Sequence, residues 1–100
     1  MPTPDPDTSQ AERDRRRAHR LAFGDILRSA RADVGLSQEG LAELAEVSRP
    51  TIARIETGTH SVSIDRLWAL AAGLGVPAHI LIARTEDRAA ELRDRLWYPR

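Results

Sequence analysis

The segment from Gly35 to Gly58 carries two short helical patterns joined by a link of only a few residues. Ser37 and Ser48 are residue types that cap helix N-termini, and each opens a run of apolar residues at helical spacing. Because the link is so short, the two helices must cross steeply, which leaves the polar face of the second helix uncovered. The apolar residues are Leu41, Leu44 and Ala45 in the first run and Ile52 and Ile55 in the second.

Two motifs in this segment match those of a known family. The chain has a Ser-Gln-x-x-Leu-Ala run at residues 37–42 and an Ile-x-x-Ile-Glu-x-Gly run at residues 52–58. With these motifs it resembles the Cro and phage-repressor type, or XRE type, of helix-turn-helix protein over roughly Phe23 to Ala83. The resemblance implies an all-α fold, a five-helix phage-repressor-like DNA-binding domain. To this the sequence adds a short C-terminal helix.

One position in the motif departs from the family pattern. Glu46 occupies the turn where the family usually has glycine. A left-handed backbone costs Glu on the order of 1 kcal/mol relative to Gly, which a packed domain can absorb. We therefore expect a strained turn within the same fold.

The composition favours one small helical domain without bound metal. Among the 100 residues, Ala and Leu outnumber Val, Ile and Thr. There is no cysteine, and the three histidines are too far apart in sequence to suggest metal ligands, so we expect neither metal nor cofactor.

Apolar runs are too short for a membrane span, and no secretory signal is recognisable at the N-terminus. A cytoplasmic protein with no membrane partner is expected.

The first helix has two candidate starting points. If Ser9 and Glu12 form a capping box, the helix begins near Gln10; otherwise it begins near His19. In both cases it runs to about Asp33.

Caps and spacing place the other helices. We expect them at residues 38–45, 49–57, 64–74 and 77–82, followed by a separate C-terminal helix capped by Thr85. This last helix has a narrow apolar stripe that must pack on its own domain or on a second subunit, and we favour dimerisation. The stripe consists of Ala89, Leu92 and Leu96, with Trp97 and Tyr98 at the tip.

We divide the chain into three parts. Residues 1–17 form an Arg-rich N-terminal arm that is disordered or partly helical, and residues 1–8, with three prolines and two aspartates, are expected to be disordered. Residues 18–83 form the helix-turn-helix DNA-binding domain. Residues 84–100 form the C-terminal helix and tail.

Formal net charge is zero, but the charges are unevenly distributed. Residues 11–20 hold five arginines and two acids, whereas residues 21–83 hold seven acids and five arginines. Attraction to phosphate must therefore come from a local cluster. The candidate DNA arm consists of Arg15, Arg16, Arg17 and Arg20, and the alternative is a solvated tail without function.

The resemblance assigns roles to residues of the motif. Arg49, Thr51 and Arg54 match the positions that contact base edges, and Arg would favour guanine; the alternative is a merely solvated helix face. Arg31 and Glu56 are expected to form a structural ion pair that ties the first helix to the third. The expected phosphate contacts are Ser37, Gln38, Ser48, Thr57 and Thr59.

These features lead to one functional hypothesis and one alternative. The chain is expected to be a sequence-specific transcriptional regulator, a repressor, that binds double-stranded DNA as a homodimer at a near-palindromic operator with half-sites about 34 Å apart. The alternative is an antitoxin whose C-terminal segment binds a toxin and which regulates its own operon. An enzyme is not expected, because no nucleophile elbow, metal-ligand spacing or phosphate loop is present.

Overall fold

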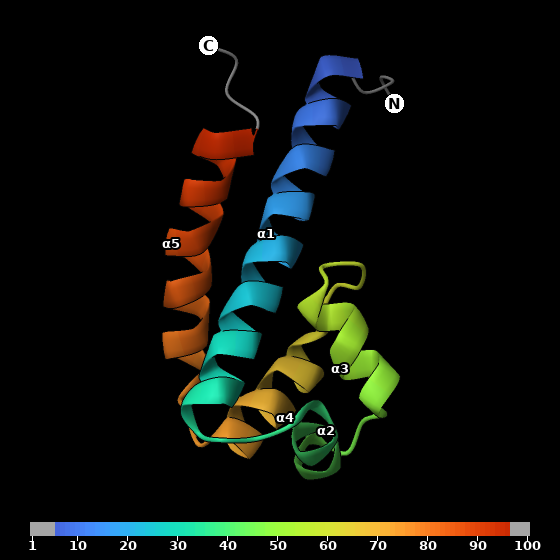
Figure 1. The fold of residues 1–100 in the computed structure, drawn as a ribbon. Helices are drawn as coiled ribbons and strands as arrows, with labels where there is room; N and C mark the ends of the chain where they lie inside the picture. The colour runs from blue at the N-terminus through green and yellow to red at the C-terminus, as the bar shows by residue number, and fades with distance from the viewer. Residues whose placement is uncertain (1–5, 97–100) are drawn as a thin grey trace.

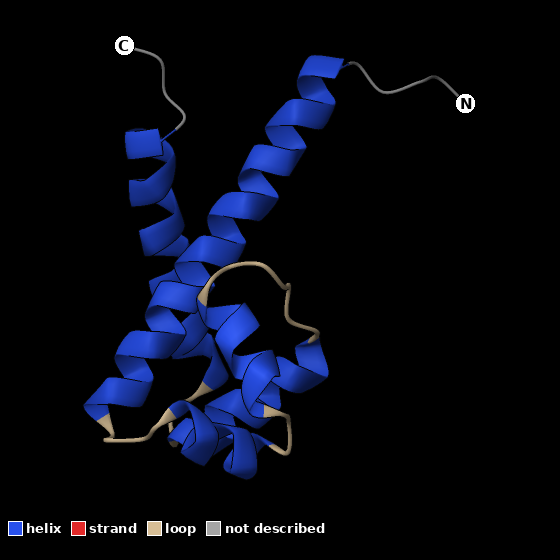
Figure 2. Cartoon of the chain, turned by 45° about the vertical axis from the view of Figure 1, so that its right-hand side comes forward, coloured by secondary structure: helices blue, strands red, loops and turns tan. Residues whose placement is uncertain are grey.

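The computed structural model describes residues 6–96, and these residues form five α-helices and no strand (Figures 1 and 2). The predicted all-α fold with five helices in the domain is confirmed. The helices are α1 (Pro6–Asp33), α2 (Gln38–Ala45), α3 (Arg49–Glu56), α4 (Ile64–Leu74) and α5 (Ala78–Leu96).

Helix α1 begins earlier than either predicted start. It starts at Pro6, so Ser9 lies inside the helix and is not its N-cap. Proline is tolerated in a first turn because its missing N–H has no partner there. Side chains one turn apart then support the exposed part: Gln10 donates to Asp14 at 2.8 Å, and Arg16 lies 3.5 Å from Glu12. Residues 6–8, predicted to be disordered, are therefore helical, while residues 1–5 lie outside the described part.

Helix α5 replaces two predicted helices. The chain does not break between Ile82 and Thr85, and one helix of 19 residues runs from Ala78 to Leu96. Thr85 is not an N-cap, because it is buried and its hydroxyl donates to the carbonyl oxygen of Leu81 at 2.7 Å. Nothing in this stretch is Gly or Pro, so the local sequence has no residue that ends a helix. Helices α1 and α5 thus cross both boundaries that we drew at 17/18 and 83/84.

Two apolar clusters hold the helices together. The larger contains residues of all five helices, and its fully buried large side chains are Leu27, Leu41, Ile52, Ile55, Leu70 and Leu81. The smaller joins α1 to the antiparallel α5 (Figure 1) and consists of Ala18, Ala22, Ala89 and Leu92. Arg88 of α5 also binds Asp25 of α1 at 3.0 Å.

The smaller cluster corrects the expected use of the C-terminal stripe. We favoured dimerisation through Ala89 and Leu92, but both pack within their own chain against α1. The reason is that α1 extends far enough towards the N-terminus to offer two buried alanines as a partner surface. The side chain of Leu96, and all of Trp97 and Tyr98, lie outside the described residues.

Helices α1 and α3 approach each other closely at Gly24. A Cβ atom at this position would lie 2.5 Å from the carbonyl oxygen of Glu56, closer than real Cβ contacts allow. Gly24 therefore permits α1 to contact the C-terminal end of α3 backbone to backbone. This contact sets the position of α3 on the rest of the molecule.

Neither a metal-binding cluster nor a single membrane-spanning helix occurs within residues 6–96. No group of three His, Asp or Glu side chains within residues 6–96 is arranged to hold a metal ion. No single helix there has the length and apolarity of a membrane span. Helices α4 and α5 taken together have the length and composition of a span, but they are bent by 106° relative to each other.

Candidate DNA-binding site

Helices α2 and α3 form the helix-turn-helix, and each is capped by a serine. The Ser37 hydroxyl accepts the backbone N–H of Gly40 at 2.9 Å, and that of Ser48 accepts the N–H of Thr51 at 3.2 Å. Between the helices, Glu46 has a left-handed backbone with φ 57° and ψ 42°, as its place in the turn predicts. The buried side of α3 is apolar, with Ile52 and Ile55 in the core, so its opposite side faces outward at the edge of the molecule (Figure 1).

Glu56 lies at the centre of a buried hydrogen-bond network beneath this outward face. Its side chain is only 3% exposed, and Arg31 binds it with two nitrogens, Nε at 2.8 Å and Nη2 at 3.1 Å. The Gln38 amide donates to the same carboxylate at 3.0 Å. The structure thus brings together Arg31 and Glu56, the pair implied by the resemblance, and adds Gln38 to it.

The pKa values of the pair follow from this geometry. Burial alone would raise the pKa of Glu56, but the hydrogen bonds from Arg31 and Gln38 outweigh burial and hold the pKa below its ordinary value. The hydrogen bond to Glu56 raises the pKa of Arg31. Both groups are therefore charged at neutral pH, and the ion pair connects α1 to the end of α3.

The outward face of α3 carries two free cations. Arg49 and Arg54 are exposed, and neither forms an ion pair with any described residue. Thr51, also predicted to contact bases, is half-buried, and its hydroxyl lies 2.8 Å from that of Ser48. Its methyl group remains the part suited to contact a thymine methyl.

The five predicted phosphate contacts differ in how many donors they keep. Ser37 uses its oxygen as an acceptor, so its hydroxyl hydrogen is free, and the first backbone N–H groups of α2 have no helical partner. Gln38 retains one amide hydrogen after binding Glu56. Ser48 shares its hydroxyl with Thr51.

The hydroxyls of Thr57 and Thr59 bond back to the backbone of α3. Both donate to the carbonyl oxygen of Arg54, at 3.1 and 3.0 Å, and so close the C-terminal end of α3. Each hydroxyl has a single hydrogen, so contact with phosphate as a donor requires that bond to break.

A family model described as helix-turn-helix matches residues 27–81 of the chain. The chain belongs to the helix-turn-helix family. The matched residues contain the motif helices, both serine caps and the Arg31–Glu56 pair.

Similar proteins with the same motif have been named as regulators. This helix-turn-helix chain is 35% identical over 68 residues to an uncharacterized HTH-type transcriptional regulator of Haemophilus influenzae, covering 68% of this chain and 69% of that protein. The crystal structure of the clp gene regulator ClgR of Corynebacterium glutamicum superposes with a TM-score of 0.73 at 30% identity, over 77% of this chain and 82% of ClgR. The restriction-modification controller protein C.AhdI of Aeromonas hydrophila is 36% identical, with a TM-score of 0.60 over 61% and 92% of the two chains.

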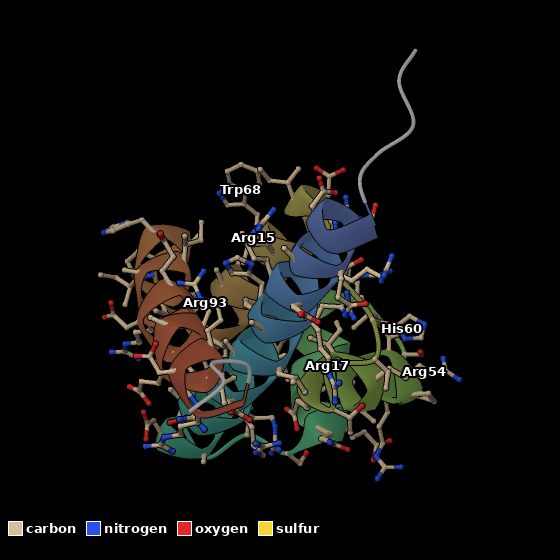
Figure 3. The ribbon with its side chains drawn as sticks, turned by 90° about the horizontal axis from the view of Figure 1, so that it is seen from above. Arg15, Arg17, Arg54, His60, Trp68 and Arg93 are labelled. Atoms are coloured by element: carbon tan, nitrogen blue, oxygen red, sulfur yellow. The ribbon has the colours of Figure 1, made fainter. Side chains whose placement is uncertain are left out.

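The candidate arm of this helix-turn-helix protein lies outside the matched residues, and its arginines do not form one cluster. Arg17 lies on the side of α1 that faces α3, where Arg54 and His60 also lie, whereas Arg15 lies on the opposite side of α1 (Figure 3). Arg20 donates from Nε to the carbonyl oxygen of Gly58 at 3.2 Å, directly after α3.

One further arginine of α1 was not among the predicted arm residues. Arg13 lines the same surface depression as Arg17 and Arg20, and these three form an arginine row with spacings of four and three residues. Helical spacing could have identified Arg13 if the helix start near Gln10 had been chosen over the one near His19. Arg16 also lines the depression but forms an ion pair with Glu12.

Proposed function

We propose that this helix-turn-helix regulator represses transcription by binding, as a homodimer, a near-palindromic operator within a promoter. The observation that carries the proposal is the outward face of α3, where Arg49 and Arg54 are exposed, without ion partners among the described residues, and held in place by a capped and buried motif. A guanidinium fork matches the O6 and N7 acceptors of guanine in the major groove. Each such contact contributes about 1–3 kcal/mol to discrimination between bases.

Phosphate contacts complete the proposed interface. The free hydroxyl of Ser37 and the first N–H groups of α2 can bind one phosphate at the helix N-terminus, although the exposed Glu39 in that turn opposes this. The row Arg13, Arg17 and Arg20 adds positive charge next to the loop that follows α3. This row supplies the long-range attraction that a mildly acidic domain lacks.

The names of the relatives support a regulatory role. ClgR is described as a regulator of clp genes and C.AhdI as a controller protein of a restriction-modification system. No catalytic step is part of the proposal, and a DNA-binding regulator of this kind acts in the cytoplasm, where bacterial DNA is found.

The antitoxin alternative gains no support from the structure. It required a C-terminal segment whose main task is to bind a toxin, but Ala89 and Leu92 of α5 are buried against α1. A partner could reach them only by separating α5 from its own domain.

Selection of bound duplexes from random DNA tests the proposal. The full chain should enrich one near-palindromic site, and Arg49→Ala or Arg54→Ala should relax the preference at specific guanines, at a cost of about 1–3 kcal/mol each. The exposed Arg95, at the far end of α5, is the matched control, and Arg95→Ala should select the same site. Absence of any enriched sequence would refute sequence-specific binding.

Transcription from a promoter containing the site should decrease when the protein is added, and an increase would refute repression.

A further inference from the structure

A pocket of about 730 Å³ lies on the helix-turn-helix regulator, and no residue of α3 lines it. Its walls come from α1, the loop between α3 and α4, α4 itself and the first turns of α5. The volume lies within the range of small-molecule sites, about 300–1,000 Å³. Its apolar residues are Phe23, Val62, Leu67 and Ile82, one from each of these four parts of the chain.

Cationic and imidazole groups surround this apolar surface. Arg16, Arg20, His19 and His60 line the pocket, against a single lining acid, Glu86. Arg16 forms an ion pair with Glu12 at 3.5 Å, whereas Arg20 has no ion pair among the described residues. The bond from its Nε to the Gly58 carbonyl positions the Arg20 guanidinium and leaves its terminal nitrogens as donors. Such a guanidinium suits a carboxylate, which can accept two parallel hydrogen bonds.

We propose that this pocket binds a small organic acid with an apolar body, and that the acid is an effector of DNA binding. The carboxylate binds Arg20, and the body packs on Phe23, Leu67 and Ile82. The effector role rests on the proposed function, because Arg20 belongs to the arginine row and the pocket includes loop residues 60–62 that follow α3. A bound carboxylate neutralises one cation of that row, so DNA affinity decreases and the salt slope falls by about 0.9.

Binding is tested on the full chain without DNA. Three acids, 2-naphthoate, 4-phenylbutyrate and octanoate, are titrated into ¹⁵N-labelled protein, with 2-naphthamide as the uncharged counterpart of the first. At least one acid should shift the amide signals of Phe23, Val62 and Leu67 and bind about tenfold more tightly than an amide can, since a charged hydrogen bond contributes about 1.5–3 kcal/mol. No binding by any of the acids, equal binding of naphthoate and naphthamide, or shifts confined to other surfaces would overturn the site.

Paired variants separate the pocket from general effects of charge and surface. Arg20→Gln should weaken acid binding about tenfold, while Arg84→Gln, at an exposed α5 position outside the pocket, should not. Ile82→Glu should abolish binding, while Val34→Glu should leave it intact; the two side chains are 44% and 48% exposed, so both variants should fold. Equal behaviour within either pair would contradict the assignment.

The effector role has its own readout. On the operator obtained by selection, a saturating acid should weaken binding severalfold, and 2-naphthamide at the same concentration should not. An unchanged operator affinity with acid bound would refute the effector role. Failure to select any operator would instead refute the proposed function, while acid binding to the free protein would still be measured. If the pocket is covered by a second copy of the chain, acid binding will strengthen on dilution into monomer, and that outcome would overturn the site in the dimer.

Discussion

Glu56 is the residue on which the site depends most, although it need not touch DNA. Its carboxylate is nearly inaccessible and receives hydrogen bonds from Arg31 on α1 and Gln38 on α2. It therefore joins three helices at the point where α3 ends. A buried carboxylate is tolerated here because both of its oxygens accept hydrogen bonds within the protein.

Removal of this carboxylate should destabilise the fold. Glu56→Ala leaves the Arg31 guanidinium without its partner in a partly buried position, so we expect the free energy of unfolding to fall by about 3 kcal/mol or more. DNA affinity should fall with it. Urea unfolding measures the first effect, and unchanged stability would show that the pair is not structural.

The same group makes stability depend on pH in a defined direction. Because the pKa of Glu56 is lowered in the folded state, its contribution is complete above the pKa of the unfolded carboxyl, about 4.3, and is lost as pH falls through the folded value. The free energy of unfolding should decrease less steeply below about pH 4 in Glu56→Gln than in the wild type. Urea titrations at pH 7, 4 and 3 provide the comparison, and parallel curves would contradict it.

Glu46 should be replaceable with a gain in stability. Its φ of 57° lies in the left-handed region, where glycine has no Cβ to clash with the backbone. We expect Glu46→Gly to raise the free energy of unfolding by up to about 1 kcal/mol. Glu43→Gly, in the preceding exposed helical turn, is the control and should lower it. A loss of stability in Glu46→Gly would show that this side chain makes a compensating contact.

At the scale of the element, α1 does two jobs at once. Ala18 and Ala22 pack against α5, while another side of the same turns carries Arg17 and Arg20, of which Arg20 binds the Gly58 carbonyl after α3. Packing against α5 thereby fixes which arginines face α3. An arm that was free in solution could not make this distinction.

Arg17 and Arg15 should consequently differ in their effect on DNA binding. Arg17→Gln should reduce the slope of log affinity against log salt by about 0.9, the value of one phosphate contact. Arg15→Gln removes the same charge from the opposite side of α1 and should change the slope little (Figure 3). Titrations between 50 and 200 mM salt give both slopes, and equal reductions would point to a flexible arm.

At the scale of the whole molecule, the proposed dimer would need a surface other than Ala89 and Leu92, which pack against α1. Ile64 and Trp68, one turn apart on α4, are large apolar side chains that are 61% and 56% exposed. Trp68 lies on a different side of the molecule from Arg54, so its burial would leave α3 open (Figure 3). Aromatic residues of this kind commonly anchor interfaces between subunits.

Trp68→Arg should therefore shift the protein from dimer to monomer and weaken operator binding at least tenfold. Sedimentation equilibrium measures the first effect and gel shifts measure the second. Val34→Arg, at an exposed apolar position outside α4, is the control and should remain dimeric. A monomeric wild type at micromolar concentration would refute the dimer itself.

The sequence by itself determined the motif and its immediate neighbours. Serine caps, apolar spacing and glycines act over a few residues, so the bounds of α2 and α4, and the left-handed turn at Glu46, could all be predicted. The ends of the chain could not. The tertiary structure decided that α1 reaches back to Pro6, that α5 is unbroken at Thr85, and that Ala89 and Leu92 face α1. The burial of Ala89 and Leu92 depends on a helix more than 60 residues away in sequence, and local propensity holds no information about such a partner.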